Sequence, residues 1–224
     1  IGYRHNPMGF KWPKGMKEVF YLDKLEGNKA VFKDGHVQET DVIILCTGYL
    51  HHFPFLSDDL KLKTGNRLYP PMLYKGVVWQ DNHNLFYLGM QDQFHTFNMF
   101  DCQSWYVRDV IMGKIKLPND TEIDQDIKKW VAMEEKLENP DQMIDFQTEY
   151  TKELHEMSDY PKIDFELIRK HFKVWEHHKV EDILTYRNKS FSSPVTGSVA
   201  PIHHTPWDKA MDDSMKTFLD QPEK

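Results

Sequence analysis

Histidines are the residues of this sequence that could most readily hold a metal ion. Adjacent histidines occur three times, at His51-His52, His177-His178 and His203-His204. Neighbouring residues on a strand or a helix point in different directions, so such pairs are poor chelates. His155-Glu156 lacks the second histidine that a zinc-protease helix requires. The sequence therefore predicts no metal site.

The glycines are spaced too widely to form a nucleotide-binding loop. A dinucleotide fingerprint needs closely spaced glycines so that the backbone can approach a pyrophosphate. The sequence has 11 glycines and no G-x-G. It also lacks the G-x-S-x-G motif of a serine nucleophile elbow. We therefore do not expect this chain to bind a dinucleotide by itself.

Two segments combine a strand end, a glycine and polar groups, as ligand sites often do. The first is 45–49 (LCTGY), which runs into 51–56 (HHFPFL), and the second is 87–98 (YLGMQDQFHTFN). In open α/β sheets, ligands bind beyond the carboxyl ends of strands, and a helix N-terminus favours anionic or carbonyl-rich ligand edges. Each segment is equally compatible with an ordinary connection between a strand and a helix.

The first half of the chain has the pattern of strands. Residues 18–25 and 29–33 have strand composition around a turn at 26–28, and Asp34-Gly35 is a strong hairpin signal. The run of β-branched residues in 41–49 predicts a strand covered on both faces. Further strands are expected at 76–79 and 84–89, with a turn at Asp81-Asn82 between them.

The second half has the pattern of helices. A helix is expected from about 98 to 113, with Gly113 and Pro118 as stop signals. Three more are expected: one capped by Asp120 or Thr121, one after Pro140, and one over about 164–186. Their predicted inward residues are Ile123, Ile127, Trp130, Leu137, Met143, Phe146, Tyr150, Leu154, Met157, Phe165, Ile168, Phe172 and Trp175. A loop at 189–201 and a last helix from Pro206, with Trp207, Met211, Met215 and Phe218 inward, complete the α/β prediction.

Composition narrows the functional classes. With 35 acidic and 28 basic residues the net charge is −7, which argues against a nucleic-acid or anionic-membrane binder. Only Cys46 and Cys102 are present, so a reducing compartment is expected. The longest apolar runs are too short to span a bilayer and no signal peptide opens the sequence, so we expect a cytoplasmic protein. The sequence starts at Ile1, which is compatible with a trimmed terminus or with a break inside a domain, and we favour the break.

The same segments carry a family resemblance. Residues 45–49 with 53–56 (FPFL) resemble the "ATGY…FPFL" segment of flavin-containing monooxygenases, except that Cys46 stands where alanine is usual. Other segments are similar to the bacterial branch that oxidises trimethylamine: 73–79 (LYKGVVW), 86–93 (FYLGMQDQ), 97–101 (FNMFD), Trp105-Tyr106, His177-His178-Lys179 and 200–207 (APIHHTPW). The resemblance runs along nearly the whole chain.

The resemblance implies the C-terminal half of a flavoprotein with two Rossmann-type dinucleotide-binding domains and a helical C-terminal region. Residues 1–16 would end the NADPH-binding domain, 17–118 would belong to the FAD-binding domain, and 119–224 would form helices packed on it. The enzyme would use FAD and NADPH to oxygenate trimethylamine and related soft nucleophiles with O2, through a C4a-hydroperoxyflavin. Its implied partner is the N-terminal half that carries the glycine loops, and the whole enzyme would be a homodimer.

The resemblance also assigns roles to residues, while the catalytic residues would lie upstream of this chain. Gln93 and Thr96 match positions that contact FAD. Asp92 and Phe94 match the substrate pocket, where many relatives have tryptophan at the second position. The positions matching NADP contacts are Arg4, His5, Trp175 and Arg187. A fork-shaped guanidinium suits a phosphate, and an aromatic wall suits a trialkylammonium ion.

Two other functions fit parts of the sequence. A Baeyer–Villiger monooxygenase would share the fold and cofactors but attack a carbonyl. A non-catalytic helical binding module would explain the absent G-x-G, although the predicted strand edges need partners that this chain does not supply.

Overall fold

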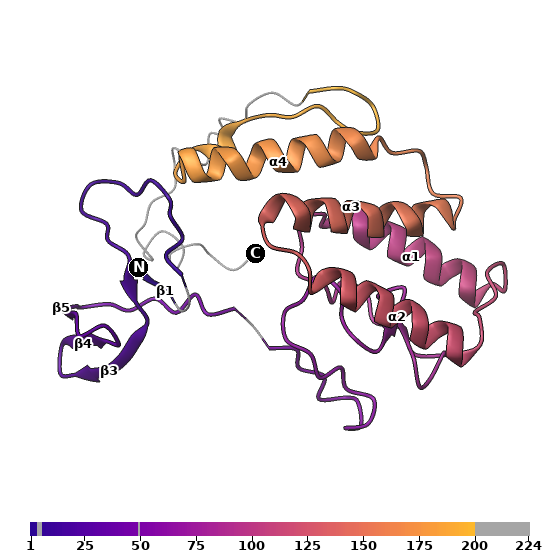
Figure 1. The fold of residues 1–224 in the computed structure, drawn as a ribbon, viewed down its shortest axis with the longest axis horizontal. Coiled ribbons are helices and arrows are strands. Elements are labelled where there is room, and N and C mark those ends of the chain that lie inside the picture. Colours follow the sequence, from indigo (N-terminus) through magenta and orange to yellow (C-terminus); the bar gives the residue numbers. More distant parts are fainter. Residues whose placement is uncertain (4–5, 49, 200–224) are drawn as a thin grey trace, which may run out of the picture.

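The computed structural model describes residues 1–3, 6–48 and 50–199, and the remaining residues lie outside the description below. The described chain is α/β, with short strands before four α-helices (Figure 1). No helix in these ranges is long and apolar enough to cross a membrane. The expected last helix from Pro206 lies outside the described residues.

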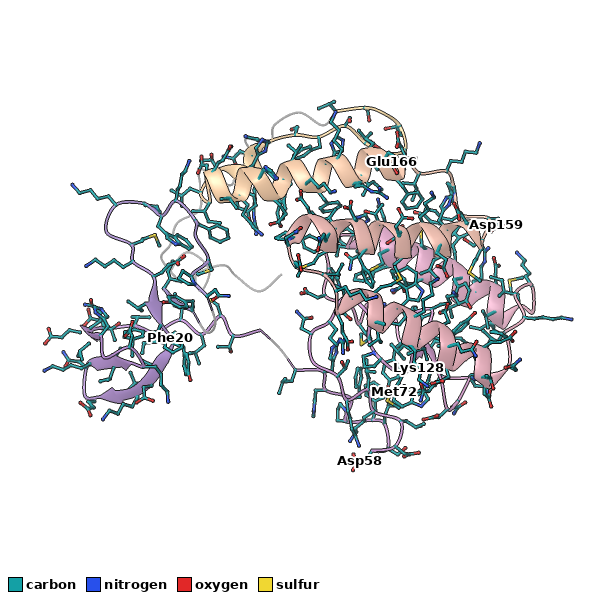
Figure 2. All side chains as sticks on the ribbon, viewed as in Figure 1. Phe20, Asp58, Met72, Lys128, Asp159 and Glu166 are labelled. Carbon is teal, nitrogen blue, oxygen red and sulfur yellow. The ribbon has the colours of Figure 1, made fainter. Side chains whose placement is uncertain are left out.

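The N-terminal strands form two small sheets. β1 (Gly2–Tyr3) pairs in parallel with β2 (Val19–Phe20), and β3 (Leu22–Glu26), β4 (Lys29–Phe32) and β5 (Val37–Glu39) form an antiparallel meander. Glycines with positive φ occupy both hairpin turns, Gly27 at 59° and Gly35 at 85°. The meander predicted from the two turn signals is therefore confirmed. Figure 2 shows its side chains spreading outward from a thin sheet, and most of them are exposed.

The buried strand predicted at 41–49 is wrong for this chain. Residues 41–48 form no strand, and Val42, Ile44 and Leu45 are 74%, 81% and 76% exposed. A central strand needs a neighbouring strand on each side and apolar cover on both faces. The described residues place no such strands beside this segment. Its β-branched composition is therefore not enough to make it a strand.

The next strands are shorter than predicted. β6 (Leu73–Tyr74) and β7 (Val78–Trp79) form an antiparallel pair, and the expected strand at 84–89 is reduced to a bridge between Val78 and Phe86. The turn at Asp81-Asn82 is confirmed by the hydrogen bond from the Leu85 amide to the Asn82 carbonyl, 2.9 Å. Gly76, with φ of 65°, lets the chain reverse between β6 and β7.

The helices agree closely with the sequence pattern. They are α1 (Phe97–Ile111), α2 (Asp120–Glu134), α3 (Pro140–Glu156) and α4 (Phe165–Glu181), followed by the short 3-10 helix η1 (Tyr186–Asn188). Asn119, rather than Asp120 or Thr121, caps α2 because its side chain and that of Glu122 form a reciprocal capping box. α4 ends at Glu181, before the predicted Tyr186.

The main core lies among α1, α2, α3 and the segment around β6 and β7. α3 packs against both α1 and α4, and α2 packs against β6 and α3. The predicted inward residues Ile123, Ile127, Trp130, Phe146, Tyr150 and Leu154 are buried in this core. Burying aromatic and aliphatic side chains of this size contributes roughly 1.5–3 kcal/mol each. The core therefore gives α3 a fixed position from which its polar residues can hold neighbouring loops.

Candidate cofactor and substrate site

Four of the residues singled out in the sequence lie on one loop. Residues 89–97, called the site loop from here on, connect the bridge at Phe86 to the start of α1. Asp92 and Thr96 are exposed on this loop, whereas Gln93 and Phe94 are half-buried. The structure thus brings the two predicted FAD contacts and the two predicted substrate residues together.

The site loop begins at a glycine that the packing requires. Gly89 has φ of 71°, and a Cβ atom there would lie 2.9 Å from the ring of Phe100. The Gly89 amide donates to Gln103 Oε1 of α1 at 2.9 Å. Any other residue would strain the backbone and displace this aromatic ring. The glycine therefore allows the loop to approach α1 closely.

Three buried side chains, Gln91, Gln103 and Tyr150, form what we call the polar network. Gln103 Nε2 donates to Gln91 Oε1 at 2.9 Å and to Tyr150 Oη at 3.0 Å. Gln91 Nε2 donates to the Gly76 carbonyl at 3.0 Å and to Tyr150 Oη at 3.2 Å. Tyr150 Oη donates in turn to the Lys75 carbonyl at 2.8 Å. Each amide hydrogen of the two glutamines is used, so the network is fully satisfied away from water.

A buried ion pair fixes the turn below the network. Lys75 is 7% exposed, has φ of 49°, and pairs with Asp126 of α2 at 2.8 Å and with Glu153 of α3. Burial lowers the pKa of Lys75, but the hydrogen bonds to the two carboxylates outweigh it and the pKa is raised. Lys75 therefore stays charged and ties the turn before Gly76 to both helices.

A second set of contacts holds the middle of the site loop from α3. Gln147 Oε1 accepts from the amides of Phe94 and His95 at 2.6 and 2.8 Å, and Gln147 Nε2 donates to the Asp92 carbonyl at 2.7 Å. The Asp92 amide donates to the Arg67 carbonyl at 2.6 Å. The backbone of the loop is thus held on both sides, while the side chain of Asp92 remains exposed.

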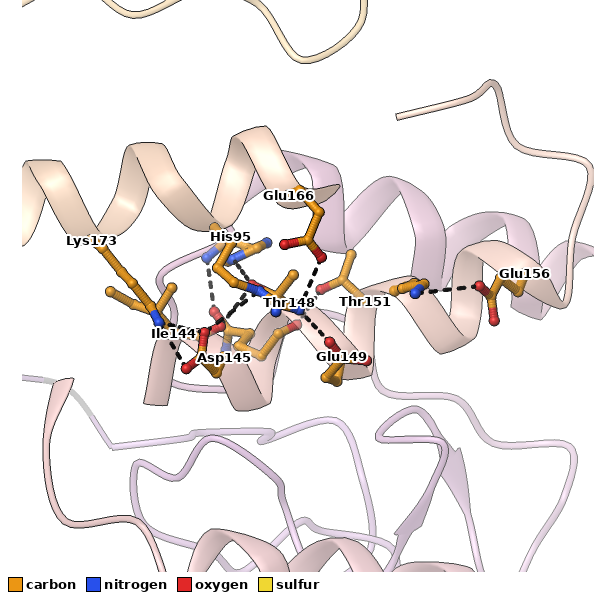
Figure 3. A network of polar contacts seen from close by, with 12 residues as sticks. His95, Ile144, Asp145, Thr148, Glu149, Thr151, Glu156, Glu166 and Lys173 are labelled. Carbon is orange, nitrogen blue, oxygen red and sulfur yellow. Dashed lines mark hydrogen bonds and ion pairs between the residues drawn. The ribbon is translucent and has the colours of Figure 1, made fainter. Parts of the chain in front are cut away.

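His95 fills the space between the site loop, α3 and α4 (Figure 3). Its ring is 1% exposed, stacks on Phe172 with centroids 4.7 Å apart, and places Nε2 3.1 Å from the hydroxyl of Thr148. Burial, and to a lesser degree the charge of Arg169, lowers the pKa of His95 to about 4. The ring is therefore neutral near pH 7 and serves packing rather than charge.

The remaining predicted side chains lie around α4. Trp175 is half-buried and meets Tyr186 edge to face, with centroids 5.1 Å apart. Arg187 is exposed, and its Nε donates to Tyr186 Oη at 2.7 Å. Tyr186 therefore brings Trp175 and Arg187 together, and we call these three residues the Trp175 cluster. Arg4 and His5 lie outside the described residues.

A mostly apolar groove of about 250 Å³ connects α4 with the start of α1. Its lining residues are Asn98, Ile168, His171, Phe172, Trp175, Phe191, Ser192 and Pro194. Asn98 follows Thr96 by two residues, so the groove runs from the end of the site loop to the Trp175 cluster. The mostly apolar lining suits an apolar group better than a charged one.

The described residues offer no metal centre, and the buried cysteine is not an activated thiol. No group of three or more His, Cys, Asp or Glu side chains in the described part of the chain could hold a metal ion. Burial, with a smaller contribution from Asp101, raises the pKa of Cys102 to about 12. That thiol is therefore protonated and unreactive.

Sequence reasoning missed the residues that hold the site. Gln103 and Gln147 were not singled out, and Tyr150 was assigned only to the core. The signal was available on α3, where Gln147, Thr148 and Thr151 are polar yet lie beside the apolar positions Phe146 and Tyr150. Polar residues on the inner face of a helix indicate buried partners.

Comparison with known proteins identifies the family. The profile described as "Flavin-binding monooxygenase-like" matches residues 16–174, more than half of the chain. The chain belongs to this family. It is 85% identical over 221 residues to a trimethylamine monooxygenase of Pelagibacter ubique (strain HTCC1002), an alignment that covers 99% of this chain and 50% of the relative. It is 54% identical over its whole length to 49% of the trimethylamine monooxygenase of Methylocella silvestris.

Solved structures agree with this assignment. The crystal structure of Tmm from Pelagibacter sp. strain HTCC7211 shares 86% identity and superposes with a TM-score of 0.89, over 97% of this chain and 50% of that one. An S-allyl-L-cysteine S-oxygenase from Allium sativum, at 23% identity and a TM-score of 0.60, shares the fold. This flavin-binding monooxygenase chain spans about half the length of the curated relatives it matches.

Proposed function

We propose that this chain provides one half of an FAD- and NADPH-dependent monooxygenase that N-oxygenates trimethylamine and related soft nucleophiles. The observation that carries the proposal is 85% identity, along 99% of the chain, to a trimethylamine monooxygenase. The other half would correspond to the part of those relatives that this chain does not cover. We call a protein that contains both halves the complete enzyme.

In this proposal the site loop forms one wall of the flavin and substrate site. Thr96 caps α1 without a side-chain hydrogen bond to the helix, and Gln93 Nε2 makes a single long contact of 3.3 Å to the Gly89 carbonyl. Both side chains therefore keep hydrogen-bonding capacity for a ligand and fit the polar edge of FAD. When bound, the flavin would supply the reducing equivalents and the activation of O2.

The two neighbouring side chains would select the substrate. The carboxylate of Asp92 is exposed and attracts small cationic amines, and its Oδ1 accepts the Gln93 amide at 3.0 Å, which orients it. Phe94 presents an aromatic ring that favours methylated amines. The family resemblance implies tryptophan at this position in many enzymes, and phenylalanine in its place would leave more space at this wall.

The Trp175 cluster would hold NADP. Trp175 and Tyr186 offer aromatic faces, and Arg187 offers a guanidinium for a phosphate, with Arg4 and His5 as the remaining proposed contacts. Under this proposal residues 1–16 end the NADPH-binding domain, 17–118 belong to the FAD-binding domain and 119–224 pack on it. The free cysteines Cys46 and Cys102 support a cytoplasmic location, and we propose a homodimer of the complete enzyme.

The proposal is tested by comparing this chain alone with the complete enzyme. By itself, the chain of residues 1–224 should aggregate, because the apolar residues of 41–48 are exposed. If it stays in solution it should be colourless, because it has no G-x-G loop with which to bind FAD. The complete enzyme should be yellow and should oxidise NADPH faster when trimethylamine is added, with trimethylamine N-oxide as product. Turnover of a cyclic ketone in place of trimethylamine would identify a Baeyer–Villiger enzyme instead, and a soluble, yellow preparation of the chain alone would contradict the division into halves.

A further inference from the structure

One side chain on α3 binds three backbone groups of the site loop. Gln147 is fully buried, accepts the Phe94 and His95 amides through Oε1, and donates to the Asp92 carbonyl through Nε2. These three bonds, of 2.6 to 2.8 Å, are shorter than the usual N–H···O distance of roughly 2.9 Å. A single amide side chain therefore binds three backbone groups of the loop over 92–95.

The contacted residues explain why the amide matters beyond packing. The two amides come before α1 begins, so no helical carbonyl is available to accept them. Fixing the backbone at Asp92 and Phe94 fixes the directions in which their side chains leave the loop. Gln147 itself touches neither of these side chains through a hydrogen bond. Its effect on them is indirect, through the backbone.

The helix that carries Gln147 is firmly held. On the same helix, Thr148 contacts the His95 ring, and Asp145 and Glu149 pair with Arg169 and Lys173 of α4 (Figure 3). On its other side α3 packs against α1. A movement of Gln147 relative to the site loop would therefore require these contacts to break together.

We propose that Gln147 is a positioning residue, which holds the site loop so that Asp92 and Phe94 face the substrate. The proposal rests on the proposed function for the roles of those two side chains, whereas the three hydrogen bonds from Gln147 to the loop backbone do not depend on it. Glutamine suits the task because its amide oxygen can accept two hydrogen bonds while its NH2 group donates in the same plane. Methionine, of similar size, offers no donor and only a weak acceptor.

The test uses the complete enzyme with Gln147→Met and a matched control, Thr151→Val. Thr151 is buried one turn further along α3, and among the described residues its hydroxyl bonds only the carbonyl of Gln147 within the helix. We expect Gln147→Met to speed hydrogen exchange of the Phe94 and His95 amides at least about tenfold, which corresponds to about 1.4 kcal/mol. It should raise the KM for trimethylamine by a similar factor and leave flavin reduction by NADPH within about twofold. Thr151→Val should change neither the exchange nor the KM.

A third variant adds a signature that a packing defect would not give. Gln147→Glu can reproduce all three bonds only when its carboxyl is protonated, because the hydroxyl then donates to the Asp92 carbonyl. Burial raises the pKa of such a carboxyl. The ratio of the KM of Gln147→Glu to the KM of the unsubstituted enzyme, both measured at the same pH, should therefore approach one as the pH falls from about 8 to about 6.

The outcomes distinguish the role of Gln147 in holding the site loop from the proposed oxygenation of trimethylamine. Equal exchange rates and equal KM values in Gln147→Met and Thr151→Val would overturn the positioning role, as would unchanged exchange at the Phe94 and His95 amides. If the unsubstituted enzyme failed to oxidise trimethylamine, the proposed function would fall. The exchange rates would still decide whether Gln147 holds the loop.

Discussion

The hydroxyl of Tyr150 joins the parts of the polar network, so removing it tests the network most directly. Tyr150 Oη donates to the Lys75 carbonyl at 2.8 Å and accepts from Gln91 at 3.2 Å and Gln103 at 3.0 Å. Tyr150→Phe keeps the ring and removes all three bonds. At about 0.5–1.5 kcal/mol for each bond, with a further cost for groups left buried and unpaired, we expect a loss of roughly 2–4 kcal/mol in the free energy of unfolding.

Tyr106→Phe is the matched control. Tyr106 is also fully buried in the main core, and its hydroxyl lies near that of Tyr74 without a well-formed hydrogen bond. Its removal should cost less than about 1 kcal/mol. The assay is urea unfolding of the complete enzyme, in which the midpoint of Tyr150→Phe should fall while the slope stays constant. Equal shifts in the two variants would show that the network adds nothing beyond the packing of the rings.

Four further outcomes are expected. Phe94→Trp in the complete enzyme should change selectivity among amines and leave flavin reduction by NADPH nearly unchanged; equal changes in stopped-flow rates for both steps would make Phe94 a packing residue. Changing Gln93 and Thr96 together to alanine should weaken FAD retention by about 0.5–1.5 kcal/mol for each lost bond, measured by flavin titration. Arg4→Ala should lower NADPH affinity about 10- to 100-fold and leave NADH affinity nearly unchanged, because a bidentate guanidinium–phosphate contact contributes roughly 1.5–3 kcal/mol. Burial lowers the pKa of His95 to about 4 in the folded protein, below the ordinary 6.5, so its contribution to stability is complete above pH 6.5 and is lost as the pH falls toward 4. The loss is at most roughly 3 kcal/mol. The unfolding midpoints measured at about pH 5 and about pH 7 should therefore differ less in His95→Gln than in the unsubstituted enzyme.

The helices could be predicted from the sequence because their signals are local. Apolar residues spaced by three or four define the inner faces of α2 and α3, and Pro140 at the first turn of α3 marks its start. The error at the start of α2 was small, since Asn119 forms a capping box with Glu122 one residue before the predicted caps. Such features need no knowledge of distant parts of the chain.

The polar network could not be predicted because its partners are distant in sequence. Gln91 and Tyr150 are separated by 59 residues, and Gln147 lies 53 residues from the Phe94 amide that it binds. A glutamine on a helix is exposed in most proteins, so its residue type alone predicts a surface position. Only the packing of α3 against the site loop shows that these amides are buried and paired.

Two segments contrast in how far the described residues of this chain hold their backbone. The site loop has its backbone held by Gln103, Gln147 and Arg67, all within the described chain, so these bonds need no residue from elsewhere. Residues 41–48 have the composition of a buried strand and yet remain exposed, since a strand is stabilised by neighbours on both sides. A preformed loop avoids the entropic cost of ordering when a ligand binds. Under the proposed function, this chain would therefore present Gln93, Thr96 and their neighbours in a fixed arrangement, whereas 41–48 would need neighbouring strands to become a strand.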